Sequence, residues 1–163
     1  MAQTYLRNKH ASTIVLEDGS LFIRVVLNDT YFSSSVEMVI AVPDLEIVSV
    51  KGEIARCFNE KCSVAIPLLQ QAVGLRIGPG LIKSITGLIG GPKGCPKMAD
   101  LILECCDQVV LHFTLRQMNK ARSYTSEQDL AVAGGEMLRQ NPGLIGSCIA
   151  FAEGSPLLEV LKE

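Results

Sequence analysis

The fold is decided by residues 14–23, which read IVLEDGSLFI. Two short apolar runs, Ile14–Leu16 and Leu21–Ile23, lie on either side of Asp18-Gly19. A tight hairpin turn requires positive φ angles, which aspartate and glycine tolerate better than most residues. This stretch therefore predicts two antiparallel strands joined by a short turn.

The strand pattern continues around this hairpin over residues 12–52, where short runs of valine, isoleucine, leucine and phenylalanine are separated by turn residues. A second hairpin is predicted to join residues 36–42 to residues 46–50. Every second residue from Val36 to Ile40 is apolar, so one face of this strand is apolar. A sheet with such a face must be covered on at least one side.

Helices are predicted after Arg56, because the hydrophobic period changes there from two to about 3.6 residues. The expected helices cover residues 63–73, residues 79–89, residues 95–120 and a segment starting at Ser126, and a further strand is expected over residues 144–151. The longest helix carries a broad apolar stripe, which is typical of the central helix of a core. The sequence thus predicts an α+β fold, with an antiparallel sheet in the N-terminal half, C-terminal helices packed on it, and a single domain over residues 1–163.

The composition excludes some classes of function. Lysine and arginine number 15 against 17 aspartates and glutamates, and no long basic run occurs, so nucleic acid is not an expected partner. Hydrophobic residues make up 48% of the chain and charged residues only 20%, with a mean hydropathy of +0.30. Because this apolar content exceeds what one small core hides, we expect a homo-oligomer, most simply a homodimer.

No targeting segment is predicted. The first ten residues, MAQTYLRNKH, lack the apolar run of a secretory signal, and prolines and charged residues interrupt the most apolar region, residues 63–91. We therefore expect a cytoplasmic protein without a membrane partner, in which the six cysteines are reduced thiols.

The most unusual motif is residues 90–97, GGPKGCPK, a glycine-rich loop that leads directly into the predicted long helix. Cys95 occupies the expected cap position, where unpaired amides and the helix dipole favour a thiolate or a bound anion. The alternative is that the glycines only allow a tight turn and that Cys95 is a small buried residue. The candidate residues for binding an anion, two glycine amides and two lysines, are Gly91, Lys93, Gly94 and Lys97.

Three functions are compatible with this motif. The first is a non-enzymatic binding or accessory module, in which the loop receives a small anionic ligand or an acidic group of a partner. The second is a thiol-dependent enzyme or redox protein, in which Cys95 attacks, the loop amides stabilise negative charge, and His112 or Cys148 assists. The third is a cysteine-based metal-binding protein, which requires thiols such as Cys57 and Cys62 to converge. The cysteine spacing assigns no metal ligands, and no cofactor is predicted.

Several motifs, taken in order, resemble the bacterial domain of unknown function DUF2889. They are Asp18-Gly19, Val36-Glu37-Met38, Asp44-Leu45-Glu46-Ile47, Cys62, Gly74–Gly80, Gly90–Cys95 and Cys148–Phe151. The resemblance spans about residues 16–156, and its most specific part is the glycine-glycine-x-x-glycine-cysteine run at a helix start. In the family this run continues with threonine, histidine and leucine, whereas here Pro-Lys-Met follows Cys95. The resemblance implies that Cys95 and Cys148 are positions of interest, and it implies no reaction.

Overall fold

The structure, a computed structural model, describes residues 4–42, 44–121 and 126–140, together with residues 145, 149, 152–155 and 158. Contacts between residues divide the chain into two compact units, Met1–Leu111 and His112–Glu163. The first unit contains the β-sheet and the helices packed on it. A single domain over residues 1–163 stays a prediction.

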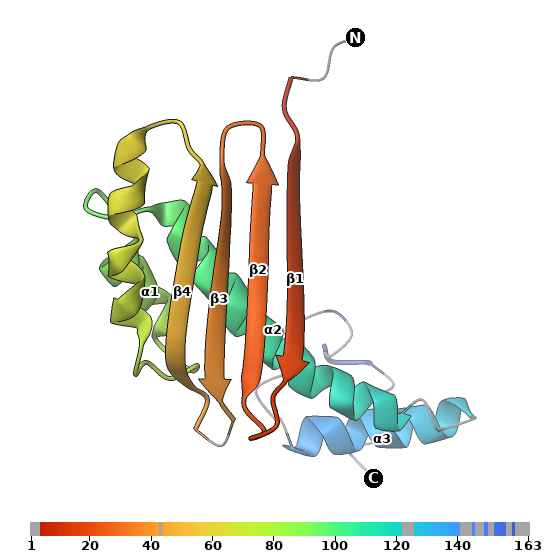
Figure 1. Cartoon of the computed structure of the whole chain (residues 1–163). Coiled ribbons are helices and arrows are strands. Elements are labelled where there is room, and N and C mark those ends of the chain that lie inside the picture. Colours follow the sequence, from red (N-terminus) through yellow and green to blue (C-terminus); the bar gives the residue numbers. More distant parts are fainter. Residues whose placement is uncertain are drawn as a thin grey trace. The chain divides into compact units, whose positions relative to one another are not determined.

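The first unit is built on a four-stranded antiparallel sheet whose strand order follows the sequence (Figure 1). Its strands are β1 (Arg7–Val15), β2 (Leu21–Asp29), β3 (Ser33–Ala41) and β4 (Glu46–Arg56). Both predicted hairpins are confirmed, and Gly19 in the first turn has a φ of 82°. The sheet is larger than predicted, because β1 already begins at Arg7.

The two central strands bury one face and leave the other partly exposed. Along β2 and β3 buried side chains alternate strictly with less buried ones, as the period of two predicted. The fully buried members, with no exposed surface, include Ile23, Val25, Val36, Met38 and Ile40. This apolar face is the one that the helices cover.

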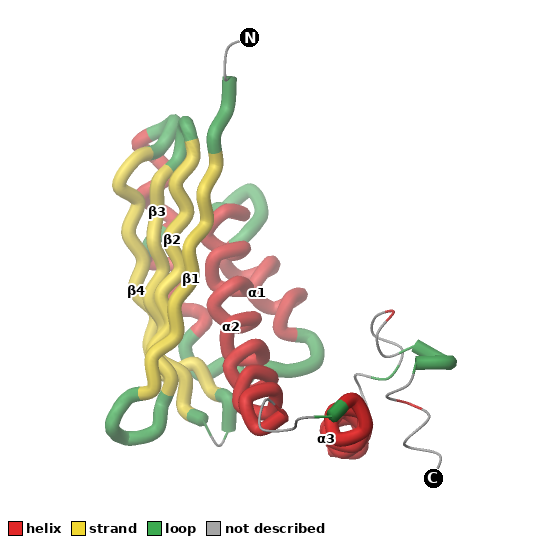
Figure 2. Tube along the Cα trace, turned by 90° about the vertical axis from the view of Figure 1, so that its right-hand side faces the viewer, coloured by secondary structure: helices red, strands yellow, loops and turns green. Residues whose placement is uncertain are grey.

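Two helices of the first unit, α1 (Leu81–Ile89) and the first part of α2 (Pro96–Ala121), lie on the same face of the sheet (Figure 2). The α+β class is therefore confirmed, with the sheet first and the helices packed on it. The buried stripe of α2 contains the predicted residues Met98, Leu101, Ile102, Cys105 and Val109. Within the described ranges, none of the helices is long and apolar enough to cross a membrane.

The second unit contains α3 (Glu127–Gln140), which begins one residue after the predicted start at Ser126. The pair Gly134-Gly135 does not interrupt this helix. The strand expected over residues 144–151 falls largely on residues outside the described part of the chain.

One prediction is wrong: residues 63–73 do not form a single α-helix. The chain instead forms two 3₁₀ helices, η1 (Glu60–Ala65) and η2 (Pro67–Ala72). The physical reason is Pro67, which lacks the amide proton that a continuous α-helix would need there. The cap is also displaced from the predicted serine, because the side chain of Asn59 accepts a hydrogen bond from the amide of Lys61 at 2.9 Å.

Candidate functional site

The glycine-rich loop before α2 is closed by its own backbone. The amide of Cys95 donates to the carbonyl of Ile89 at 2.8 Å, and the amide of Gly94 donates to the carbonyl of Gly91 at 3.2 Å. The amide of Gly90 donates to the last turn of α1. Since these amides are already bonded to main-chain carbonyls, the amide of Gly94 is not open to an anion, and the predicted cradle is smaller than expected.

Position 94 requires glycine because the main chain of Ile89 approaches it closely. A Cβ atom at this position would lie 2.0 Å from the carbonyl oxygen of Ile89, closer than any real contact. Gly91 instead has a φ of 70° and open space around it. The two glycines therefore serve the tight turn, which is the alternative that the sequence left open.

Cys95 caps α2 as predicted, but through its main chain. Its carbonyl accepts the amides of Met98 at 3.1 Å and Ala99 at 3.0 Å, and the residue is half-buried. Pro96 has no amide proton, so the first turn of this helix presents fewer free donors than an ordinary N-terminus.

The residues predicted to assist Cys95 are placed elsewhere along the chain. His112 belongs to the second unit, about five helical turns of chain after Cys95. Its ring contacts Phe113 edge-on, with ring centroids 5.5 Å apart. Cys148 lies outside the described residues. The described part of the chain thus brings no base to Cys95.

Two further cysteines, Cys105 and Cys106, are buried in α2. Burial, reinforced by neighbouring groups, raises the pKa of both thiols, that of Cys106 to about 12. The pKa of the Cys57 thiol is also raised, mainly by burial and next by the nearby Cys62 thiol. No group of three metal-ligating side chains occurs among the residues that the structure describes, so the thiols of Cys57 and Cys62 have no third ligand there.

A charged cluster that the sequence did not predict lies at the end of β2. The side chain of Asp29 is only 1% exposed. Its Oδ1 atom accepts the amides of Tyr31 at 2.9 Å and Phe32 at 2.7 Å, which fixes the turn into β3. Its Oδ2 atom accepts three side-chain donors, the hydroxyl of Tyr5 at 2.9 Å, the guanidinium of Arg7 at 3.1 Å and the ammonium of Lys97 at 3.3 Å.

A third cation joins from the end of β4. Arg56 donates to the side-chain oxygen of Asn28 at 2.7 Å and to the main-chain carbonyl of Asp29 at 2.5 Å. The start of β1, the turn after β2, the end of β4 and the first turn of α2 therefore meet at one point. We call this group the Asp29 cluster, which consists of Tyr5, Arg7, Asp29, Tyr31, Phe32, Arg56 and Lys97.

Aromatic rings line the same cluster. Tyr5 and Tyr31 stack with their ring centroids 6.5 Å apart, and both are about half exposed. The guanidinium of Arg7 lies 5.6 Å from the centroid of the Tyr5 ring. The ammonium of Lys97 lies 4.5 Å from the centroid of the Phe32 ring. These contacts hold the cations in place without cancelling their charge.

The Asp29 cluster contains more positive than negative groups. Burial alone would raise the pKa of Asp29, but the hydrogen bonds from Tyr31, Tyr5, Phe32 and Arg7 lower it more, so the pKa is held well below its usual range. Asp29 is therefore a carboxylate at neutral pH. Three cations surround this one carboxylate group, two bonded to it directly and Arg56 bonded to the main-chain carbonyl of the same residue. The side chains of Arg7 and Lys97 are 49% and 40% exposed. The cluster thus carries surplus positive charge that reaches solvent.

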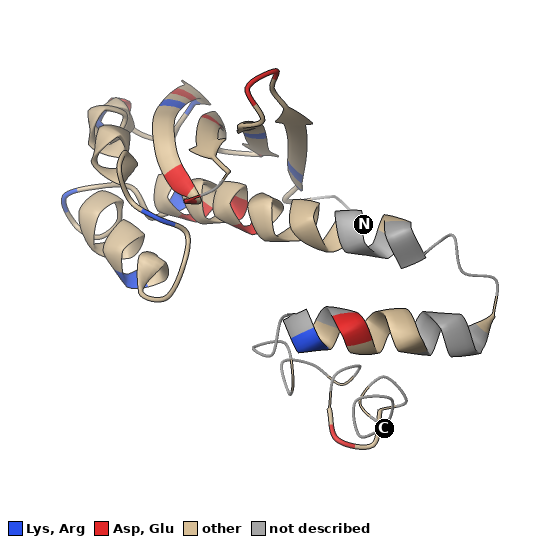
Figure 3. Cartoon of the chain, turned by 90° about the horizontal axis from the view of Figure 1, so that it is seen from below, with Lys and Arg blue, Asp and Glu red and all other residues tan. Residues whose placement is uncertain are grey.

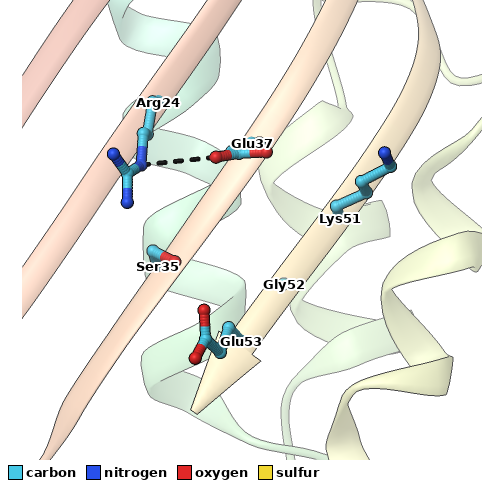
Figure 4. A pocket seen from close by; sticks show the side chains of 6 residues that line it. All are labelled: Arg24, Ser35, Glu37, Lys51, Gly52 and Glu53. Atoms are coloured by element: carbon cyan, nitrogen blue, oxygen red, sulfur yellow. Dashed lines mark ion pairs between the residues drawn. The ribbon is translucent and has the colours of Figure 1, made fainter. Parts of the chain in front are cut away.

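The open face of the sheet carries a second feature, a hollow of about 220 Å³ (Figure 4). Its lining residues are Arg24, Ser35, Glu37, Lys51, Gly52 and Glu53. Arg24 and Glu37 form an ion pair across it at 3.3 Å. Its two cations and two carboxylates balance, and the volume is below the ~300 Å³ of the smallest ordinary ligand pockets. The hollow is therefore a weaker candidate than the Asp29 cluster.

The wider distribution of charge agrees with the absence of a basic run in the sequence. Figure 3 shows lysines and arginines as separate patches on the ribbon of the described residues, not as one continuous stripe. A nucleic-acid backbone needs such a stripe to bind along its length.

The fold and the site define the first unit as an α+β domain whose concentrated charge lies at the start of its longest helix. Residues 7–110 match the family DUF2889, described as a protein of unknown function, and the chain belongs to this family. The match starts earlier and ends earlier than the resemblance over residues 16–156, so Cys148 lies beyond it. Neither the curated proteins nor the solved structures include a significant match to the chain.

Sequence reasoning missed the cluster because its members come from four separate elements. One local signal was present: Asn28-Asp29-Thr30 is typical of a turn in which an aspartate side chain accepts following amides. That signal predicts the turn after β2. It does not predict that Arg7, Arg56 and Lys97 converge on the same residue, Asp29.

Proposed function

We propose that this protein is a non-enzymatic binding module that recognises a small anion, or an acidic group of a partner, at the Asp29 cluster. The observation that carries the proposal is the convergence of three cations on one buried residue: Arg7 and Lys97 bond to the carboxylate of Asp29, and Arg56 bonds to its main-chain carbonyl. Lys97 was already a candidate from the sequence, and Lys93 lies in the adjoining loop. The binding site is therefore shifted from the loop amides to these side chains.

The cations keep donors for a ligand. A guanidinium group has five N–H donors in a planar arrangement that suits carboxylates and phosphates. Arg7 gives one described bond to Asp29, and the ammonium of Lys97 likewise gives one of its three donors. Asp29 orients these side chains, while its own charge offsets only one of the three.

The position of the cluster adds to its attraction for an anion. Lys97 lies in the first turn of α2, where the helix dipole places partial positive charge. The exposed ring pair of Tyr5 and Tyr31 offers a surface on which a planar part of a ligand can stack. Both features favour a small phosphate or carboxylate compound.

The proposal is tested by the rise in Tm that a bound ligand causes. The wild-type chain is heated with inorganic phosphate and, at equal ionic strength, with chloride. We expect a larger rise in Tm with phosphate, and we expect Arg7→Gln, Arg56→Gln and Lys97→Gln each to weaken phosphate binding about tenfold. Lys51→Gln, which removes an exposed lysine from the open face of the sheet, is the matched control and leaves binding unchanged.

Two results would contradict the proposal: an equal rise in Tm with both salts, or equal binding by all four variants and the wild type. A glutamate-rich peptide titrated in the same assay separates the two ligand sources. Tighter binding of the peptide than of phosphate favours an acidic group of a partner, and the reverse favours a small anion.

A further inference from the structure

The two edges of the sheet differ in how far other segments cover them. At the β4 edge, Ile47 exchanges hydrogen bonds with the segment 74–75 at 2.9 Å, and the amide of Ile77 donates to the carbonyl of Leu45 at 2.9 Å. Further along, the side chain of Gln70 donates to the carbonyl of Val50 at 2.7 Å. Much of the β4 edge is therefore covered. β1 forms the opposite edge, and no described residue of the first unit pairs with its outer side (Figure 1).

The hydrogen-bond parity shows which groups of β1 point outward. At one end Thr30 donates its amide to the carbonyl of Leu6, and at the other Leu16 donates its amide to the carbonyl of Ser20. In an antiparallel pair such bonded residues alternate with non-bonded ones. The even-numbered residues of β1 therefore bond to β2. The amides and carbonyls that point to the free edge belong to Arg7, Lys9, Ala11, Thr13 and Val15.

The side chains of this edge are unusually exposed for a strand. No residue of β1 is buried, whereas five of the nine residues of the adjacent β2 are. Ile14 is 55% and Val15 56% exposed, and Leu16 just after the strand is 38% exposed. An open edge with exposed apolar side chains is a template for pairing with another strand.

Charge selects the partner. The start of β1 is basic, with Arg7 and Lys9, and the turn after it is acidic, with Glu17 and Asp18. A second copy of β1, placed antiparallel about a two-fold axis near Ser12 or Thr13, sets the basic end of each strand against the acidic end of the other. Residues at the same position on both strands then meet only near the axis.

We propose that β1 pairs with β1 of a second copy of this chain, in antiparallel orientation, to form one continuous eight-stranded sheet. The paired edge satisfies the outward amides and covers Ile14 and Val15. With the axis at Thr13 it also brings Glu17 of the partner subunit near Lys9, whose ammonium pairs with Glu104 within its own chain. This interface supplies a surface for the homodimer that the apolar composition predicted. It is independent of anion binding at the Asp29 cluster.

The test is the molar mass of the full chain by light scattering over a range of concentrations. We expect a mass that rises from 17.6 kDa toward twice that value as concentration increases. Thr13→Pro removes an outward amide and no bond to β2, and proline is tolerated on edge strands, so this variant stays folded and monomeric. Glu17→Lys weakens the dimer about tenfold by opposing like charges. Glu53→Lys, an equal charge change on the open face, is the control and leaves the dimer unchanged.

The proposal is overturned if the wild type keeps a mass of 17.6 kDa at every concentration. It is also overturned if a dimer forms but Glu17→Lys dimerises as tightly as the control. If Thr13→Pro unfolds, hydrogen exchange of the wild type takes its place. Exchange of the amides of Ala11 and Thr13 that is slow at high concentration and fast at low concentration supports the interface. Exchange that is fast at all concentrations contradicts it. Phosphate-dependent Tm is measured in parallel and stays unaffected by these variants.

Discussion

Two regions meet at the start of α2, the loop of residues 90–95 and the Asp29 cluster, and they are stabilised in opposite ways. The loop is closed by hydrogen bonds among its own neighbouring backbone groups. The cluster is held by side chains that are 22 to 68 residues apart along the chain. The loop is the conspicuous motif, but the amides of Gly90, Gly94 and Cys95 are used in bonds to neighbouring carbonyls. The cluster is inconspicuous in sequence, yet it retains charge and donors that face solvent.

The largest loss of stability in either region is expected from Asp29→Ala. The change leaves the turn amides of Tyr31 and Phe32 without their acceptor and two cations, Arg7 and Lys97, without their carboxylate. We expect Tm to fall by roughly 10 °C. Asp18→Ala is the matched control, because Asp18 also accepts two bonds, from Ser20, in an exposed turn. Thermal unfolding that shows equal losses for both variants would contradict the central position of Asp29.

A smaller loss is expected from Gly94→Ala in the loop. The new Cβ would lie 2.0 Å from a main-chain oxygen, so the backbone must move and the bond from Cys95 to Ile89 must lengthen. We expect about 2–3 kcal/mol of destabilisation in chemical unfolding. Gly91→Ala meets no neighbour and carries only the strain of its positive φ, so about 1 kcal/mol is expected. A larger loss for Gly91 than for Gly94 would show that the turn is closed differently.

The acid sensitivity of the two regions should also differ. The pKa of Asp29 is lower in the folded chain than in the unfolded one, so its contribution to stability is present above the unfolded pKa and is lost as pH falls through the folded pKa. Unfolding free energy measured from pH 6 down to pH 2 should fall less steeply in Asp29→Asn than in the wild type. Identical slopes would mean that the carboxylate is not held in its charged form. Gly94→Ala, which changes no titrating group, should keep the wild-type slope.

The smallest effect is expected from Cys95→Ser. The loop is closed by main-chain atoms, so we expect Tm within about 2 °C of the wild type and unchanged phosphate binding. Iodoacetamide labelling near neutral pH provides the second measurement. A thiol-dependent function predicts that Cys95 reacts well before the half-buried Cys57 and Cys62, together with loss of function in the serine variant. Similar slow labelling of all three thiols agrees with a binding module.

Much of the fold was predictable because its signals are local. The Asp18-Gly19 turn, the alternation of β3 and the stripe of α2 each report one element through its own residues. The helix expected over residues 63–73 failed for an equally local reason. The apolar stripe of this segment predicts one helix, but Pro67 divides it into η1 and η2.

The site was less predictable because its chemistry depends on distances between elements. The sequence indicates Lys97 as a candidate through its place near Cys95, and not through its bond to Asp29. The cradle predicted from Gly94 requires an open amide, and only the structure shows that this amide is bonded to the carbonyl of Gly91. Charged residues on separate strands become a site only when the register of the sheet is known.

The most direct test of the account is to map inorganic phosphate onto the full chain by amide chemical shifts at constant ionic strength. We predict saturable shifts at Arg7, Tyr31, Arg56 and Lys97, which require about tenfold more phosphate for saturation in Arg7→Gln. Saturable shifts confined to Gly91, Lys93 and Gly94, or no saturable shift at any of these residues, would contradict the claim that the surplus charge around Asp29 binds anions.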